Sequence, residues 1–354
     1  MAETLKAIRA RIDVLDERLV KLLSDRARLA QRIGTVKQGA AYRPEREAQI
    51  LRRVAALNRG PLADAALIRI ATEIMSACRA LEERMTVAYL GPAGTFSQEA
   101  VLKHFGGLTL QQACTSIDEV FRQVETGAVG YGVVPVENST EGAIGRTLDL
   151  LLATPAQVCG EVMLPVHQCL MAKTRKRVEI RKLYSHTQSL AQCQQWLARY
   201  LPEAERIAVV SNAEAARLAA KERRAGAIGP KTAAGLYGLN VLARDIEDEP
   251  RNTTRFLVLG EEGAGPSGKD KTSLIVSTRN VPGAMHQMLS PLAANGVSMT
   301  RLESRPARTG LWEYVFYVDI EGHERDPTVA KALREMREWV TVLKVLGSYP
   351  MAAA

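Results

Sequence analysis

The stretch LKAIRARIDVLDERLVKLLSDRARLAQRIGTV, residues 5–36, decides how the first part of the chain folds. Its apolar residues recur at alternating spacings of three and four, with one break at Arg26. This pattern is typical of a heptad seam on a single helix. Such a helix would be about 50 Å long at about 1.5 Å per residue. A seam of that length exceeds what a small domain can cover, so we expect a partner helix from a second chain.

Arg26 interrupts this seam, and a buried guanidinium needs a nearby anion. A structural glutamate could supply that anion, or the side chain could extend to water. Lys37 follows on the same face. Residues 43–50 are expected to start a second helix, opened by a proline, and a third helix is expected at 61–85. Both of these helices also carry Arg and Glu.

Residues 1–85 hold 17 Lys and Arg against 11 Asp and Glu, although the whole chain has a formal charge of only +8. A basic segment favours an anionic partner. Tyr42 is the only aromatic residue in this segment, and it contains no histidine. Nucleic-acid binding usually needs interleaved aromatic residues, so we expect a pocket for a small dianion, without a nucleophile.

Residues 1–85 resemble the all-helical chorismate mutases, which are intertwined dimers. The resemblance implies carboxylate contacts from Arg26 and from Arg9 of the partner subunit, and contacts to the ether oxygen from Lys37 and Glu82. It also implies further substrate contacts from Arg43, Arg46, Glu47 and Cys78. A pericyclic rearrangement needs positioning and charge stabilisation rather than a base. A glutamate donates a hydrogen bond only when protonated, so mutase activity should fall as Glu82 ionises, from a pKa raised by its pocket.

From Val87 the pattern changes to alternating strands and helices. Four strand–loop–helix joints lie at 87–105, 131–144, 182–197 and 225–239. They predict two α/β lobes facing across a cleft, with helix N-termini available to anions. The first joint, GPAGTFS, is neither a dinucleotide fingerprint nor a P-loop.

The motifs GPAGTFS, VPVENSTEGAI, YSH and NTTRF together resemble the prephenate dehydratase domain, across residues 86–260. The family is similar in fold to periplasmic-binding-protein-like two-lobed proteins and uses neither metal nor cofactor. The resemblance implies that Thr254 orients or protonates the leaving hydroxyl, while Arg255 fixes a carboxylate or holds the loop. Glu137 and His186 are candidate proton relays, and an ion pair of Glu137 with Arg255 or Arg146 is the structural alternative. The neutral donors that it implies are Thr95, Ser97, Asn138, Ser139 and Thr140.

Residues 260–271 are rich in glycine and charge, which is typical of a linker. The rest of the chain, 272–350, has the βαββαβ order of a ferredoxin-like fold. Two motifs here resemble those of an ACT domain, which implies regulation by phenylalanine; the alternative is a simple cross-sheet pair of Glu303 and Arg305. The residues of this expected regulatory site are Gly283, Ala284, Met285, Glu303, Ser304, Arg305 and Pro306.

The order of the three modules predicts a bifunctional enzyme that takes chorismate to prephenate and prephenate to phenylpyruvate, under feedback by phenylalanine. Two alternatives stay open: a dehydratase whose helical module is only a dimerisation arm, and a non-enzymatic solute sensor. We expect a homodimer or a tetramer, with no cofactor, metal, nucleic-acid or membrane partner. The five cysteines form no C-x-x-C pair, and the chain has no apolar leader, so we expect reduced thiols and a cytoplasmic protein.

Overall fold

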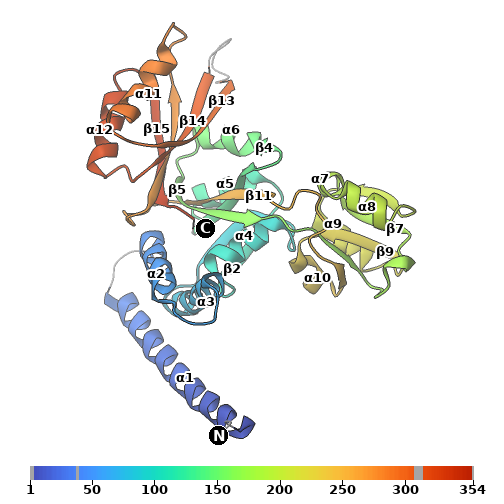
Figure 1. Cartoon of the computed structure of the whole chain (residues 1–354). Coiled ribbons are helices and arrows are strands. Elements are labelled where there is room, and N and C mark those ends of the chain that lie inside the picture. Colours follow the sequence, from blue (N-terminus) through green and yellow to red (C-terminus); the bar gives the residue numbers. More distant parts are fainter. Residues whose placement is uncertain (1–3, 37–39, 307–313, 353–354) are drawn as a thin grey trace.

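The computed structural model describes residues 4–36, 40–306 and 314–352. It begins with three helices, and the first of them extends away from the rest of the molecule (Figure 1). Their bounds are α1 (Leu5–Val36), α2 (Pro44–Leu57) and α3 (Asp64–Glu82). The prediction of one helix over 5–36 is therefore confirmed, and so is the start of the second helix within 43–50 at Pro44.

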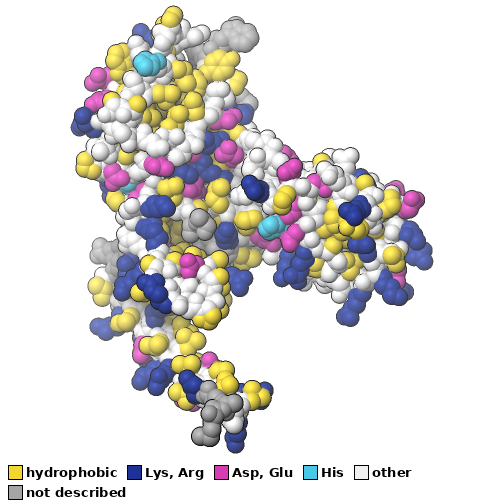
Figure 2. Space-filling view, viewed as in Figure 1, with side chains coloured by type: hydrophobic (Ala, Val, Ile, Leu, Met, Phe, Trp, Pro, Cys, Tyr) yellow, Lys and Arg dark blue, Asp and Glu magenta, His cyan; other side chains and the backbone are white. Residues whose placement is uncertain are grey.

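The seam of α1 lies open in the single chain. Leu15 is 60% exposed and Leu22 is 66% exposed, and Figure 2 shows hydrophobic and basic side chains next to one another on this helix. Only one end of α1 packs well against α3, where Ala30 is buried. A chain that leaves so many leucines in water has an incomplete hydrophobic core in this region.

The next unit contains two sheets, and strands alternate with helices in both of them. The first sheet has the order β2-β1-β3-β11-β5, with β4 paired to β3. The elements of this first lobe are β1 (Thr86–Leu90), α4 (Phe96–Phe105), β2 (Leu110–Cys114), α5 (Ile117–Glu125), β3 (Tyr131–Asn138), β4 (Gly142–Ala143), α6 (Gly145–Ala153), β5 (Gln157–Pro165) and β11 (Thr253–Gly260).

The second sheet has the order β10-β6-β9-β7-β8. It forms a separate lobe that is joined to the first by two chain crossings, at about residues 166–168 and 244–252 (Figure 1). Its elements are β6 (Cys169–Ala172), the 3₁₀ turn η1 (Arg177–Glu179), β7 (Lys182–His186), α7 (Thr187–Gln192), α8 (Gln194–Tyr200), β8 (Glu205–Val209), α9 (Asn212–Ala219), β9 (Ala225–Gly229), α10 (Lys231–Tyr237) and β10 (Asn240–Ala243). The four predicted strand–loop–helix joints are present.

The last unit has the predicted βαββαβ order and a four-stranded antiparallel sheet, β13-β14-β12-β15. One face of this sheet carries the two helices. The other face shares an apolar cluster with the first lobe, in which Tyr349 and Leu346 pack near Leu151 and Val158. Its elements are β12 (Asp270–Ser277), α11 (Ala284–Ala294), β13 (Met299–Pro306), β14 (Tyr314–Glu321), α12 (Pro327–Met336) and β15 (Val342–Pro350).

The glycine-rich stretch at 260–271 is packed rather than free, which corrects the expectation of a simple linker. Asp270 is 5% exposed, and its carboxylate accepts hydrogen bonds from the backbone N–H groups of Ser267 and Gly268. Helix α2 also contacts this stretch, since Arg52 donates to the carbonyl of Ser267. The helical module is therefore tied to the segment that leads into the last unit.

Among the described residues, no helix combines the length and the apolar character needed to span a bilayer.

Candidate functional sites

A pocket of about 290 Å³ lies between the three N-terminal helices. It gathers six of the eight residues expected for the mutase, and its walls include four arginines and two glutamates. The expected residues in its lining are Arg26, Arg43, Arg46, Glu47, Cys78 and Glu82. The excess of positive charge suits a small dianion.

Arg26 is the residue that breaks the heptad seam, and its guanidinium reaches the third helix. Its Nη1 donates to the Sγ of buried Cys78 at 2.8 Å. Glu82 stands one turn after Cys78 and lies against α1, because a methyl group on Gly34 would come within 3.3 Å of its Cγ. The glycine thus allows α1 and the Glu82 side chain to approach closely.

Two expected mutase residues are not in this lining. Arg9 lies on the exposed N-terminal half of α1, so it could reach a site only in another chain. Lys37 lies outside the described residues.

Arg79 is a pocket residue that the sequence analysis missed. It is 6% exposed, it forms an ion pair with Glu47, and it donates to the carbonyl oxygen of Phe105 in the first lobe. Burial raises the pKa of Glu47, and Arg79 partly offsets this effect. The same pattern that drew attention to Arg26, a basic residue on the apolar face of a helix, is present at Arg79. This residue lies four positions after the buried Met75 and on the same face.

The second group of expected residues lies at one edge of the first sheet. Strands β1 and β3 are parallel and β11 is antiparallel to β3, so the ends of β1 and β3 meet the start of β11 there. Asn138 Nδ2 donates to Thr254 Oγ1 at 2.9 Å and to Asn252 Oδ1 at 2.8 Å. Within the described chain, the Thr254 hydroxyl hydrogen has no acceptor and Asn252 Nδ2 has no hydrogen-bond partner.

Backbone contacts fix the neighbouring loop. Asn138 Oδ1 accepts from the N–H of Thr140 at 3.0 Å, and Ser139 Oγ accepts from the N–H of Thr253 at 3.0 Å. Thr95 stands ahead of α4, and Ser97 is buried in its first turn. Ser139 and Thr140 therefore lie next to the neutral pair of Asn138 and Thr254, while Thr95 and Ser97 lie at the start of α4.

The two lobes touch through residues that no sequence argument assigned. Glu99, on α4, accepts from the Thr232 hydroxyl at 2.9 Å and from its N–H, which belongs to the first turn of α10. Burial raises the pKa of Glu99, and the bonds from Thr232 oppose that rise. On the second lobe, His186 precedes α7, and its Nδ1 accepts from the N–H of Gln188. This bond leaves Nε2 as the protonated nitrogen of the neutral ring.

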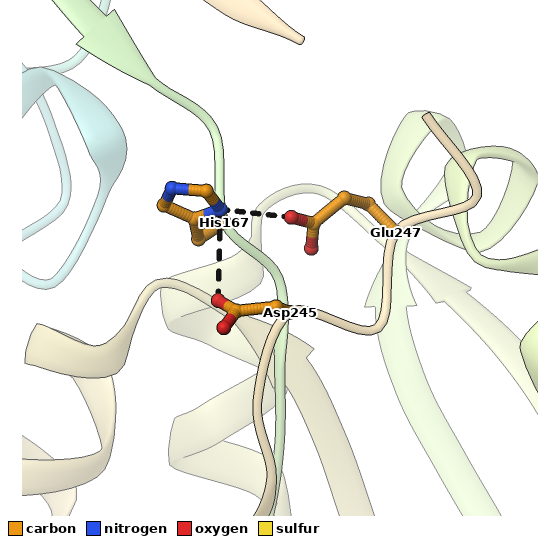
Figure 3. A group of neighbouring side chains, drawn as sticks. All are labelled: His167, Asp245 and Glu247. Carbon is orange, nitrogen blue, oxygen red and sulfur yellow. Dashed lines mark hydrogen bonds and ion pairs between the residues drawn. The ribbon is translucent and has the colours of Figure 1, made fainter. Parts of the chain in front are cut away.

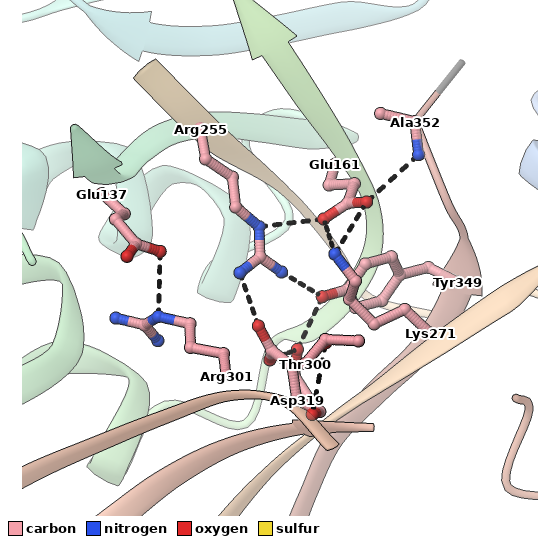
Figure 4. A network of polar contacts seen from close by, with 10 residues as sticks. Glu137, Glu161, Arg255, Lys271, Thr300, Arg301, Asp319, Tyr349 and Ala352 are labelled. Carbon is pink, nitrogen blue, oxygen red and sulfur yellow. Dashed lines mark hydrogen bonds and ion pairs between the residues drawn. The ribbon is translucent and has the colours of Figure 1, made fainter. Parts of the chain in front are cut away.

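Two expected dehydratase residues face away from Thr254. Arg255 is buried against Glu161, Asp319 and Tyr349 (Figure 4), so it holds the strand onto the last unit, which favours the structural one of its two expected roles over the binding of a carboxylate. Glu137 lies 2.9 Å from Arg301 Nε. It is therefore held in an ion pair rather than placed as a proton relay.

The ion-pair alternative for Glu137 was right in kind but wrong in its partner. Arg146 instead pairs with Asp118, and Arg255 has the partners given above. The reason is alternation along a strand: Asn138 and Thr254 face one way, and the residues next to them face the other.

The expected regulatory residues lie in the last unit, with Gly283–Met285 at the start of α11 and 303–306 at the end of β13. Gly283 has a φ of 81°, a conformation that favours glycine. Arg305 does not form a cross-sheet pair with Glu303, because its guanidinium pairs with Asp149 of α6 at 3.2 Å.

One group of side chains has the composition of a metal site. His167 Nδ1 lies 2.8 Å from Glu247 and 3.5 Å from Asp245, across the two chain crossings (Figure 3). The other oxygen of Glu247 accepts the N–H of Gln168. These contacts connect the two chain crossings.

Three family models match the chain in succession. They are chorismate mutase type II at residues 8–83, prephenate dehydratase at 87–264 and the ACT domain at 272–338. Two relatives named bifunctional chorismate mutase/prephenate dehydratase are similar over almost the whole chain. The one from Stutzerimonas stutzeri is 51% identical over 99% of both chains, and the one from Escherichia coli K12 is 34% identical over 98% of this chain and 96% of its own.

A solved structure is also similar. The prephenate dehydratase of Arthrobacter aurescens in complex with L-Phe is 33% identical, covers 75% of this chain and 90% of its own, and has a TM-score of 0.69.

Proposed function

Because the chain belongs to the family of bifunctional chorismate mutase/prephenate dehydratases, we propose which of its residues carry each reaction. It rearranges chorismate to prephenate, and it converts prephenate to phenylpyruvate, carbon dioxide and water. Its ACT domain fits feedback inhibition by phenylalanine.

The arginine-rich pocket between the N-terminal helices supports the mutase assignment most directly. Arg26 and Arg9 of the partner subunit bind the two carboxylates, while Lys37 and protonated Glu82 stabilise the charge that grows on the ether oxygen. Arg46 and Glu47 lie beside the substrate hydroxyl, with Arg43 and Cys78 completing the wall. Pre-placed donors of this kind lower the barrier of a reaction that needs no nucleophile.

The bond between Asn138 and Thr254 supports the dehydratase assignment. In the reaction the carboxylate leaves as carbon dioxide, its electron pair enters the ring, and the ring hydroxyl departs as water after gaining a proton. Asn138 fixes the Thr254 oxygen, so that the threonine hydroxyl can donate to the leaving group. Ser139, Thr140, Thr95 and Ser97 orient the substrate as neutral groups, and His186 Nε2–H, on the second lobe, is the candidate to resupply the proton.

A homodimer is part of this proposal. The exposed seam of α1 and an apolar groove of about 730 Å³ between α1 and α3 would both be covered by the helical module of a second chain. The same pairing would bring Arg9 to the pocket of its partner. We also place the protein in the cytoplasm, supported by five buried cysteines that form no disulfide.

One assay tests both sites. Purified protein receives chorismate alone at several pH values, while chorismate loss and phenylpyruvate formation are followed together. We expect both to proceed, with chorismate loss slowing as the pH rises and Glu82 ionises. If chorismate persists while added prephenate is consumed, the helical module is only a dimerisation arm. Chorismate loss that does not change with pH would remove the donor role of Glu82.

A further inference from the structure

The catalytic pair of the dehydratase has a second face that belongs to the regulatory domain. Thr254 and Asn138 are opposite one another in the β11–β3 ladder, and Arg255 and Glu137 are the next pair along it. Side chains alternate between the two faces of a sheet. If Arg255 or Glu137 moves, the movement therefore reaches Thr254 or Asn138 through one peptide unit of the same strand.

The Arg255 half of this link is closed. Its guanidinium bonds Glu161 at 2.8 Å, Asp319 and the Tyr349 hydroxyl at 2.9 Å, and all four side chains are buried (Figure 4). Burial, followed by the charge of Asp319, raises the pKa of Tyr349, so its hydroxyl stays protonated. A guanidinium whose three nitrogen atoms are all hydrogen-bonded is held in a fixed position, because any movement would break several bonds at once.

The Glu137 half is incomplete by comparison. Its partner Arg301 is only 12% exposed in its side chain, yet both Nε and Nη2 of Arg301 are buried with no hydrogen-bond partner among the described residues, so Nε lies close to the Glu137 carboxylate without a well-formed hydrogen bond. A buried guanidinium with an unused donor has a second arrangement available at low cost. This pair, rather than the Arg255 network, is the contact that can change.

Arg301 also stands on the strand that carries the expected phenylalanine motif. It lies on β13, on the same face as Glu303 and Arg305, and Arg305 contacts Asp149 and the backbone at Gly145 of α6. Strand β13 is one of the two edge strands of its sheet, with β14 as its single neighbour. Through Arg301 and Arg305 it contacts both ends of the loop at 138–145, and it lacks the second ladder of hydrogen bonds that holds the central strands β12 and β14.

We propose that Arg301 is the residue that couples effector binding to the dehydratase: through its ion pair with Glu137, the position of β13 sets the position of Asn138 and hence of the Thr254 hydroxyl. This inference rests on the proposed function, since it requires that phenylalanine binds at the motif on β13. In this proposal Arg301 acts through Glu137, so it is a positioning residue.

Three quantities test the proposal in full-length protein: kcat/KM for prephenate, the phenylalanine concentration for half inhibition, and phenylalanine affinity by calorimetry. In Arg301→Gln we expect kcat/KM and affinity within about threefold of the wild type. Half inhibition should need at least about tenfold more phenylalanine, or inhibition should become incomplete, within the usual range of allosteric coupling. Arg301→Lys keeps the charge and should retain part of the coupling.

The matched control is Lys331→Gln, which removes a cation from the same domain. Lys331 pairs at 3.8 Å with Glu335 on the exposed face of α12, and its inhibition should equal that of the wild type. Glu137→Gln should reproduce the shift in half inhibition, and the double variant should add nothing to it, since both changes remove one contact.

Inhibition of Arg301→Gln at the wild-type concentration would overturn the proposal. So would a loss of phenylalanine affinity that matches the loss of inhibition, because Arg301 would then belong to the effector site. A wild-type enzyme that phenylalanine neither binds nor inhibits would instead remove the regulatory function itself, and this result is visible before any variant is made.

Discussion

Thr254 and Arg255 are neighbours in sequence but serve different parts of the molecule. The threonine accepts a hydrogen bond from Asn138 at the edge between the lobes, while the arginine is buried against the last unit. Two adjacent polar residues on one strand therefore have different functions, because their side chains lie on opposite faces of the sheet.

Removing the Thr254 hydroxyl should abolish the second reaction alone. We expect Thr254→Ala to lower kcat for prephenate by about 100-fold or more, the usual contribution of a positioned proton donor, with prephenate binding and chorismate loss nearly unchanged. Thr254→Ser keeps the hydroxyl and should retain most of the rate. Full turnover by the alanine variant would move the donor role to another residue.

His104 makes stability depend on pH. Burial, followed by the Arg79 charge, lowers its pKa to about 3, and the Tyr42 hydroxyl lies within hydrogen-bond distance of its Nε2, at 2.6 Å. Because this pKa lies below the unfolded value of about 6.5, protonation of His104 favours the unfolded state. The free energy of unfolding is therefore fully preserved above pH of about 6.5, and it falls by about 1.4 kcal/mol per pH unit as the pH drops from there toward about 3.

We therefore expect wild-type protein to lose about 2 kcal/mol more than His104→Gln between pH 7.5 and pH 5.0, because glutamine does not titrate. Chemical denaturation at the two pH values measures this difference. Equal losses in both proteins would show that His104 is not held in its neutral form.

At the scale of an element, α1 is a helix whose stability comes from outside its own chain. Its propensity and spacing suffice to define it, but most of its apolar seam is exposed, and isolated amphipathic helices gain most of their stability from packing.

A charge in the seam should separate the chains and stop the mutase. We expect Leu15→Asp with Leu22→Asp to give monomers of the helical module and to abolish chorismate loss, since Arg9 of the partner subunit would be absent. The dehydratase should keep its activity on prephenate. Lys21→Asp, which adds the same charge off the seam, is the control. Analytical ultracentrifugation and the two assays provide the test, and a variant with full mutase activity as a monomer would contradict the dimeric site.

At the scale of the whole molecule, a buried guanidinium links the mutase pocket to the dehydratase. Arg79 pairs with Glu47 in the pocket and donates to the carbonyl of Phe105 in α4. The same contact holds the pocket wall and docks the helical module on the first lobe.

Removing Arg79 should harm stability and activity together. Burial already raises the pKa of Glu47 in the folded protein. The protonated carboxyl group therefore favours the folded state at low pH, and this stabilisation is lost as the pH rises through the folded-state pKa. Without Arg79 that pKa rises further, and we expect Arg79→Leu to cost about 3–5 kcal/mol at neutral pH. Glu47 should then ionise only at a higher pH, and the pH profile of mutase activity should shift in the same direction.

Thermal denaturation and the mutase pH profile measure these effects. The double variant Arg79→Leu with Glu47→Gln should recover most of the stability but not the mutase, because the uncompensated charge is gone while the substrate contact is lost. A single variant as stable as the wild type would show that Arg79 is not needed to balance Glu47.

Local patterns were enough to determine much of this protein. The alternating spacing of three and four specified α1, the strand–loop–helix joints specified two lobes, and βαββαβ specified the last unit, because these periods are properties of neighbouring residues. Helical spacing also places Cys78 and Glu82 on one face of α3, but the pocket that joins them with Arg26, Arg46 and Glu47 depends on the packing of three helices.

The tertiary structure decided which groups meet across the chain. Periodicity states that Thr254 and Arg255 face opposite ways but not which way is toward the substrate. The partners of Arg255, Arg79 and Arg301 come from distant segments, as with Asp319, which is 64 residues from Arg255. A charge can be buried beside any counter-charge that the fold brings close, and the packing of whole elements selects that partner.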